Sequence, residues 1–72
     1  MTIEGREHKK PSIAELQRYT REKASLEFIL GNGDRIVGRL RWFDDQAFSI
    51  EPEGQLPITI LRAAVLGYRL YT

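Results

Sequence analysis

Few residues of this 72-residue chain have the types and spacing that catalysis requires. Asp44 and Asp45 are adjacent carboxylates of the kind used in hydrolysis or metal binding, but neighbouring strand residues point to opposite faces and no third ligand is nearby. His8 has no serine, cysteine or second histidine arranged around it. We therefore predict a protein that binds without catalysis.

The glycine-rich segment 31–34 is a second candidate for chemistry. A phosphate-binding loop is longer and is followed by a Lys-Ser or Lys-Thr pair and a helix, none of which occurs here. Gly31, Asn32, Gly33 and Asp34 accept positive φ and lie between two strand-like runs. The segment therefore predicts a tight hairpin.

Basic residues form the third candidate group. Eleven lysines and arginines are nearly offset by ten acidic residues, so the net charge of +1 does not by itself indicate a nucleic-acid partner. Three arginines, Arg35, Arg39 and Arg41, have the same parity and would share one strand face. They either contact phosphate or form a solvated face with ion pairs. Six other basic residues lie in the first 24 positions: Arg6, Lys9, Lys10, Arg18, Arg21 and Lys23.

The length of the chain predicts self-association. Seventy-two residues make one domain, and a domain of this size buries only about 60% of the surface that its unfolded chain exposes. There is no cysteine for a disulfide or a thiolate metal site, and a single histidine makes a structural zinc implausible. Oligomerisation is the remaining source of stability, and we expect no cofactor and no metal.

The composition also bears on location. The hydrophobic share of 42% and the charged share of 29% are those of an ordinary folded domain. No apolar run approaches the roughly 18 residues that span a bilayer. Glu4 and Glu7 lie where a signal peptide would be apolar. We therefore expect a cytoplasmic protein with no membrane contact.

The candidate residues depend on the elements that position them. Residues 1–9 are polar and aperiodic, which predicts a flexible tail before a domain at 10–72. Ser12 and Glu15 have the spacing of a capping box, and Pro11 is compatible with a helix entry. An apolar stripe of about three helical turns follows and requires a sheet to cover. Its members are Ile13, Leu16 and Thr20, with Tyr19 beside them.

The apolar period then changes to two, which predicts a half-buried strand over 24–30. A second strand should run from Arg35 to about Phe43, and Gly38 within it indicates a bend or a close approach of another backbone. The inner-facing residues of this strand would be Ile36, Leu40 and Trp42.

Three more short strands are expected. Phe48 and Ile50 share a face of the third, the fourth covers 56–61 and the fifth covers 65–71, with 62–64 as a link. One helix and five short strands form a small α+β, mainly β, or barrel-like pattern. If the fourth and fifth strands are opposite edges, each subunit can pair an edge with the next and close a ring.

Several of these residues match a known family. Asn32-Gly33, Gly38 and Phe43-Asp44 follow one another at intervals of five and resemble the first Sm motif as it occurs in Hfq proteins. Segment 62–65 is similar to a degenerate second motif. The resemblance covers about residues 9–71. It is strongest to the cyanobacterial Hfq-like branch, to which the sequence Gly-Arg-Leu-Arg-Trp at 38–42 is particularly similar. It implies an Sm-like fold, in which a helix precedes a strongly bent five-stranded antiparallel sheet, assembled in a homo-oligomeric ring.

The resemblance also implies a hexamer that binds U-rich or A-rich RNA on two faces, as a post-transcriptional regulator or RNA chaperone. Hfq holds uridines with a lysine, a histidine, a stacking aromatic and a glutamine. Arg62 stands at the lysine position, but Ala63 replaces the histidine and Gln46 replaces the aromatic. Because stacking contributes about 1–3 kcal/mol per base, uridine recognition should be weaker here.

We therefore predict phosphate contacts from Arg62 and Lys10 on the helix face and from Arg35 on the opposite face. The predicted RNA-binding residues are Arg62, Lys10, Phe43, Asp44, Gln46, Arg35, Asn32 and Arg18. For Phe43 and Trp42 the alternative role is core packing, and for Asp44 it is a turn that bonds the backbone. The alternative function is an Sm-like ring that has lost most RNA affinity and docks a protein partner. Salt-dependent RNA binding would separate the two functions, because phosphate contacts release counterions.

Overall fold

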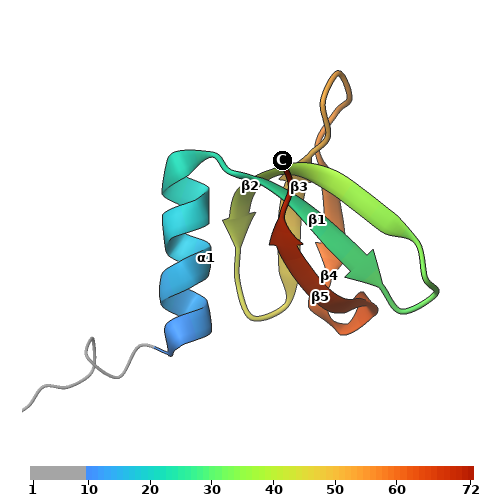
Figure 1. Cartoon of the computed structure of the whole chain (residues 1–72). Helices are drawn as coiled ribbons and strands as arrows, with labels where there is room; N and C mark the ends of the chain where they lie inside the picture. The colour runs from blue at the N-terminus through green and yellow to red at the C-terminus, as the bar shows by residue number, and fades with distance from the viewer. Residues whose placement is uncertain (1–9) are drawn as a thin grey trace, which may run out of the picture.

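The computed structural model describes residues 10–72, and the tail predicted at 1–9 lies outside the described residues. The predicted order of one helix and five strands is confirmed, although the fourth strand begins at Ile58 and the fifth ends at Leu70 (Figure 1). The elements are α1 (Pro11–Glu22), β1 (Ser25–Leu30), β2 (Arg35–Phe43), β3 (Ala47–Glu51), β4 (Ile58–Leu61), the 3-10 helix η2 (Arg62–Ala64) and β5 (Val65–Leu70).

Helix α1 does not begin with the predicted capping box. Lys10 is the N-cap residue, its backbone is extended (φ −67°, ψ 148°), and it makes no side-chain capping hydrogen bond. Pro11 follows as the first helical residue, where its fixed φ and missing N–H cost nothing. Ser12 is therefore already inside the helix, so the capping-box interpretation is wrong. The helix ends where Lys23 adopts the left-handed conformation (φ 54°, ψ 43°).

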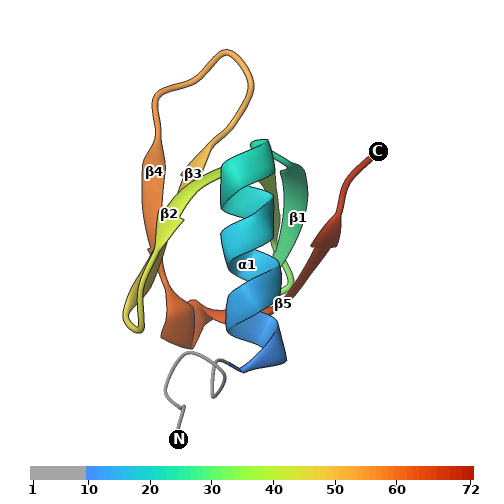
Figure 2. The same cartoon turned by 90° about the vertical axis from the view of Figure 1, so that its left-hand side faces the viewer.

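The five strands form one antiparallel sheet in the order β4-β3-β2-β1-β5. The long strand β2 pairs with β1 through 35–39 and with β3 through 39–43, so it belongs to both halves of the sheet. Figure 2 shows the two halves curving toward each other with α1 across the open side. The predicted strongly bent sheet is confirmed, and β4 and β5 are its two edges.

The core joins α1 to the inner side of the sheet. The predicted stripe is buried at Leu16 and Tyr19 and half-buried at Ile13 and Thr20. Three aromatic rings from three strands pack together: the ring centroids of Phe28 and Phe48 are 5.2 Å apart, and Tyr68 lies 5.8 Å and 6.2 Å from them. Aromatic pairs of this kind contribute about 0.5–1.5 kcal/mol each beyond area burial. The core residues are Leu16, Tyr19, Leu26, Phe28, Leu40, Phe48, Ile50 and Ile60.

Strand β2 is irregular between Leu40 and Trp42. Leu40 pairs with Ile50 and Trp42 pairs with Ser49, so Arg41 is the extra residue of a β-bulge. The insertion reverses the side-chain parity beyond Leu40. As a result Phe43 packs against the core, whereas Trp42 faces outward and is 43% exposed. The prediction that Trp42 faces inward is wrong, because strict alternation does not continue through a bulge.

Gly38 allows β2 and β3 to approach closely. A Cβ atom at this position would lie 2.5 Å from Cγ2 of Ile50 and 2.8 Å from the carbonyl oxygen of Glu51. Neither separation is compatible with an unshifted side chain, and the second neighbour is backbone. The close approach expected from a strand glycine is therefore confirmed, and Gly38 lies next to Arg39, where β2 passes from pairing with β1 to pairing with β3.

We expect Gly38→Ala to lower the free energy of unfolding by about 1–3 kcal/mol, because the added methyl group has no space between β2 and β3. Urea denaturation followed by circular dichroism would measure the loss. Gly31→Ala is the matched control, since its Cβ would lie an ordinary 3.8 Å from the carbonyl oxygen of Ala64. Equal stability of the two variants would contradict the proposed role of Gly38.

Candidate nucleic-acid interface

Helix η2 places Arg62 against the turn between β2 and β3. The backbone N–H of Arg62 donates to the carbonyl of Gln46 at 2.9 Å, and its guanidinium donates to the carbonyl of Asp44 at 3.1 Å. The Cζ atom lies 4.9 Å from the centroid of the Phe48 ring. These contacts orient a half-buried cation beside the turn.

Asp44 organises the same turn. Its carboxylate oxygen Oδ1 accepts hydrogen bonds from the backbone N–H groups of Gln46 at 2.8 Å and of Ala47 at 2.9 Å. Its own N–H donates to the carbonyl of Ala47 at 3.0 Å. The interpretation of Asp44 as a backbone-bonding turn residue is confirmed. Its carbonyl is also the group that receives the Arg62 guanidinium.

A hollow of about 430 Å³ lies where the first turn of α1 approaches this turn, and we call it the Arg62 hollow. It brings together four of the predicted residues, although they come from distant parts of the sequence. Sequence reasoning missed the contribution of Ser12, Ile13 and Asp45, because it assigned Ser12 to a cap and Ile13 to the core. The lining residues are Lys10, Ser12, Ile13, Phe43, Asp44, Asp45 and Arg62.

The charges of the Arg62 hollow are mixed. Lys10 and Arg62 can donate charge-assisted hydrogen bonds to a phosphate. Asp44 and Asp45 oppose an anion, although the carboxylate of Asp44 is already bonded to backbone N–H groups. Phe43 is the one aromatic side chain among the lining residues that the structure describes. The hollow is therefore better suited to holding a phosphate than to stacking a base.

Gln46 and Ala63 do not line this hollow. Gln46 is exposed at the turn and contributes its backbone carbonyl to Arg62, while Ala63 is exposed on η2. The structure thus places no ring at either of the positions where the family resemblance implies an aromatic and a histidine.

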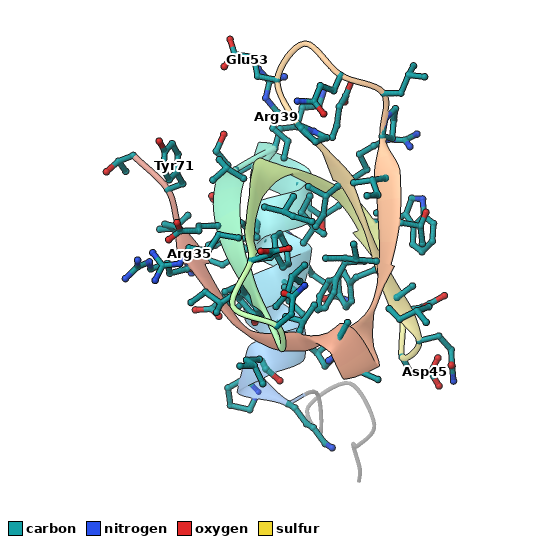
Figure 3. All side chains as sticks on the ribbon, turned by 90° about the vertical axis from the view of Figure 1, so that its right-hand side faces the viewer. Arg35, Arg39, Asp45, Glu53 and Tyr71 are labelled. Atoms are coloured by element: carbon teal, nitrogen blue, oxygen red, sulfur yellow. The ribbon has the colours of Figure 1, made fainter. Side chains whose placement is uncertain are left out.

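Two predicted residues, Asn32 and Arg35, lie at the β1–β2 hairpin, apart from the Arg62 hollow. The Oδ1 atom of Asn32 accepts from the N–H of Asp34 at 2.9 Å, which is a turn-forming contact. The Nη1 atom of Arg35 lies 3.8 Å from the carboxylate of Glu27. The same carboxylate accepts a hydrogen bond from Nε of Arg69 at 2.7 Å. Figure 3 shows Arg35 and Asp45 on opposite sides of the molecule. Arg35 therefore lies on a different surface from the Arg62 hollow, which is the division that the sequence analysis predicts.

Arg18 belongs to neither group. It is exposed on α1, and its Cζ atom lies 5.2 Å from the centroid of the Tyr19 ring. Tyr68, which the sequence did not single out, ties β5 to the helix: its hydroxyl donates to Glu15 at 3.4 Å. Burial raises the pKa of Tyr68 above its ordinary value, and the negative charge of Glu15 adds to this effect.

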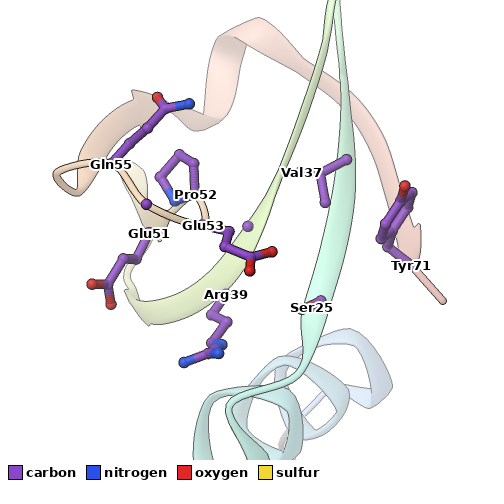
Figure 4. A pocket seen from close by; sticks show the side chains of 10 residues that line it. Ser25, Val37, Arg39, Glu51, Pro52, Glu53, Gln55 and Tyr71 are labelled. Carbon is purple, nitrogen blue, oxygen red and sulfur yellow. The ribbon is translucent and has the colours of Figure 1, made fainter.

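A second hollow, of about 420 Å³, lies between the β1–β2 pair, the β3–β4 loop and the C-terminal end of β5 (Figure 4). Arg39 and Tyr71 supply a cation and an aromatic ring there, and Glu51 and Glu53 supply carboxylates. Tyr71 was missed as a site residue because the sequence pattern placed it at the end of a strand. This hollow contains none of the eight residues predicted for the RNA interface.

Two further observations concern membrane spans and metal ligands. Within residues 10–72, no helix is long and apolar enough to cross a membrane. The same residues contain no group of three or more His, Cys, Asp or Glu side chains placed to hold a metal ion.

A family model described as Hfq related matches residues 10–70, which is most of the chain. The chain belongs to the Hfq-related family. A solved Hfq protein from Anabaena sp., a cyanobacterium, shares 31% sequence identity with a TM-score of 0.77, covering 85% of this chain and 97% of that chain. This match agrees with the predicted resemblance to the cyanobacterial branch. No curated protein sequence matches significantly.

A second solved structure, the pleiotropic translational regulator Hfq, has a TM-score of 0.81 and covers 96% of this chain and 100% of that chain. Its sequence identity is 16%, so it shows the fold alone. The Sm-like fold of this Hfq-related protein is thereby confirmed. The Arg62 hollow lies at the η2 segment that the sequence analysis compared with the second motif of the family.

We expect Asp44→Ala to destabilise the protein by about 1–3 kcal/mol, because two backbone N–H groups lose their acceptor. Asp44→Asn keeps an oxygen acceptor and should cost less. Thermal denaturation of both variants measures the difference. If alanine and asparagine have the same effect, the contribution of Asp44 is its charge and not the turn.

Proposed function

We propose that this Hfq-related protein forms a homo-oligomeric ring, expected to be a hexamer, that binds single-stranded RNA as a post-transcriptional regulator or RNA chaperone in the cytoplasm. Residues 10–72 would form the ring domain, and its role is binding without catalysis. The observation that carries the proposal is the convergence of Lys10 and Arg62 in one hollow on the helix side. The match of residues 10–70 to the Hfq-related family model supports an RNA-binding role.

The two edges of the sheet support ring assembly. Strands β4 and β5 each have one neighbour in the sheet of the described chain, so each has an open edge. Large apolar side chains are exposed on or beside both edges, and such strands pair with other chains. Since the two edges differ, the contact between subunits is heterologous. Such contacts close into a ring when the rotation from one subunit to the next divides a full turn evenly. The exposed residues are Leu56 (87%), Leu66 (75%), Leu61 (62%), Leu70 (52%), Tyr71 (51%) and Ile58 (42%).

The Arg62 hollow supports a phosphate contact. The Arg62 guanidinium is held against the Asp44 carbonyl and the Phe48 ring, so little conformational entropy is lost when it binds an anion. Lys10 lies at the rim of the same hollow as the exposed N-cap of α1, where the positive end of the helix dipole also favours a phosphate. On the opposite surface, Arg35 would make the second RNA contact, although it is paired with Glu27.

One observation favours a second candidate function, a protein-interaction scaffold. The Arg62 hollow contains the carboxylates of Asp44 and Asp45, and Gln46 and Ala63 supply no ring for base stacking. A ring with weak RNA affinity would still present identical surfaces around its circumference. Such a ring would dock a partner protein on one face.

For the ring, we expect Leu66→Glu to convert the assembly into smaller species, because a carboxylate buried at the β5 edge costs several kcal/mol. Sedimentation velocity at micromolar concentration measures the change. Ala14→Glu adds the same charge to an exposed position of α1 and should leave the ring intact. A wild-type protein that sediments as a folded monomer would refute the ring.

For RNA, we expect Arg62→Ala to weaken binding of labelled U-rich RNA about tenfold or more, since a charge-assisted hydrogen bond contributes about 1.5–3 kcal/mol. Lys10→Ala should reduce the slope of log affinity against log salt by about 0.7, as expected when one contact to a single-stranded phosphate is lost. Arg35→Ala changes a cation on the other surface, so it is the matched control and should leave the binding of U-rich RNA at the Arg62 hollow unchanged.

The same titrations distinguish the two candidate functions. Tight, salt-sensitive binding that Arg62→Ala abolishes supports an RNA-binding ring. Negligible RNA binding at low salt by a ring of full size would refute the first proposal and favour the scaffold.

A further inference from the structure

The second hollow, of about 420 Å³, is lined in part by a row of side chains across three strands, and we call it the Tyr71 hollow. Ser25, Arg39 and Glu51 are direct partners across β1, β2 and β3, so their side chains point to the same side of the sheet. Leu40, the neighbour of Arg39, is buried in the core, so the row faces away from the core. The Tyr71 hollow therefore lies on the face of the sheet that α1 does not cover.

Backbone hydrogen bonds fix the two sides of the Tyr71 hollow. Glu53 belongs to a tight turn in which the N–H of Gln55 donates to the carbonyl of Pro52 at 3.2 Å, and Gly54 has the positive φ of 74° that such a turn requires. The N–H of Tyr71 donates to a carbonyl of β1 at 3.0 Å. Figure 4 shows Glu53 and Tyr71 on opposite sides of the hollow.

The Tyr71 hollow combines an aromatic ring with charges of both signs. Arg39 supplies a cation, and Glu51 and Glu53 supply carboxylates. The ion pairs within residues 10–72 all involve Glu27, so none of these three charges forms a salt bridge with another residue of that range. A polycation would be repelled by Arg39, and a simple anion would be repelled by the two carboxylates. A flat ligand with hydrogen-bond donors on one edge and an anionic group elsewhere matches all of these groups.

We propose that the Tyr71 hollow binds a guanine nucleotide, either free or at the end of an RNA strand. The base stacks on the ring of Tyr71, which is 51% exposed. Its N1–H and its exocyclic amino group donate to the carboxylate of Glu53, and its phosphate contacts Arg39.

The carboxylate of Glu53 makes the hollow selective for guanine. Guanine has two adjacent N–H donors on its Watson–Crick edge, and an ionised carboxylate accepts both. Adenine and cytosine have an unprotonated ring nitrogen on that edge, and uracil has two carbonyl oxygens there. Each of these acceptors would face the carboxylate without a proton between them, which is unfavourable. Stacking on Tyr71, by contrast, is available to every base.

The Tyr71 hollow is separate from the surfaces of the proposed function. It shares no lining residue with the Arg62 hollow. None of its lining residues belongs to β4 or β5, so pairing of these edges in a ring leaves the lining outside the paired strands. Guanine binding there therefore does not depend on RNA binding at Arg62.

Isothermal titration calorimetry of the full-length protein with GMP, AMP, CMP and UMP tests the ligand. We expect GMP to bind about tenfold or more tightly than the other three nucleotides, because it alone pairs both donors with the carboxylate. Guanosine, which lacks the phosphate, should bind more weakly than GMP. Arg39→Gln should remove this difference between GMP and guanosine.

Two further variants test the location. Glu53→Gln keeps the length of the side chain but replaces the carboxylate, so it should weaken GMP about tenfold and leave AMP unchanged. Glu22→Gln makes the same change at an exposed position of α1 and should keep the preference for GMP. Tyr71→Ala should weaken GMP about fivefold or more through the loss of stacking. Circular dichroism would verify the folding of each variant.

A single guanosine at the end of oligo(U) distinguishes the two sources of the ligand. If this strand binds more tightly than oligo(U) and GMP competes the gain away, the ligand is an RNA end. If GMP binds but the terminal guanosine adds nothing, the ligand is the free nucleotide. Arg62→Ala should leave GMP binding unchanged, so this measurement is independent of the RNA titrations at the Arg62 hollow.

Three results would overturn the proposal. One is the absence of saturable GMP binding at millimolar concentration, and another is equal affinity for the four nucleotides. The third is a Glu53→Gln variant that is folded and still prefers GMP to the same extent as the wild-type protein.

Discussion

Strand β2 pairs with β1 along its first part and with β3 along its second, and the rest of the structure depends on the bend between these parts. Gly38 permits the bend, because a side chain there would collide with Ile50 and with the backbone of Glu51. The curvature encloses the aromatic cluster of Phe28, Phe48 and Tyr68 and leaves one open side for α1. A flat sheet would bury these rings less well and would have no place for the helix.

The same bend determines what remains exposed. Because β2 is shared by both halves, the sheet ends in β4 and β5, whose open edges carry exposed leucines. A chain of this size has a small core, so covering these edges is the main way in which it can gain stability. Ring assembly would therefore serve folding as well as function, since it buries apolar surface and pairs the edge strands in one contact.

The Arg62 hollow shows how local hydrogen bonds bring distant segments of the chain together around one recess. Asp44 shapes the β2–β3 turn through its carboxylate and receives Arg62 through its carbonyl, while Pro11 sets the start of α1 so that Lys10 and Ser12 face the same space. This arrangement also brings the carboxylates of Asp44 and Asp45 close to the cations. Phosphate binding there should accordingly be sensitive to salt and weaker than in a purely basic site.

The sequence by itself determined the order of the elements, the alternation of Leu26 and Phe28 in β1, the hairpin at Asn32-Gly33 and the special role of Gly38, because these follow from local periodicity and from glycine stereochemistry. It also predicted that Arg62 and Asp44 belong to an RNA interface, and both residues line the Arg62 hollow. Only the tertiary structure decided that Trp42 faces outward, since one inserted residue at Arg41 reverses parity and leaves no clear mark in the sequence pattern. It likewise decided that Ser12, Ile13 and Asp45 join Lys10 and Arg62 around one hollow, because proximity across a bent sheet depends on how its strands pair and where the helix packs.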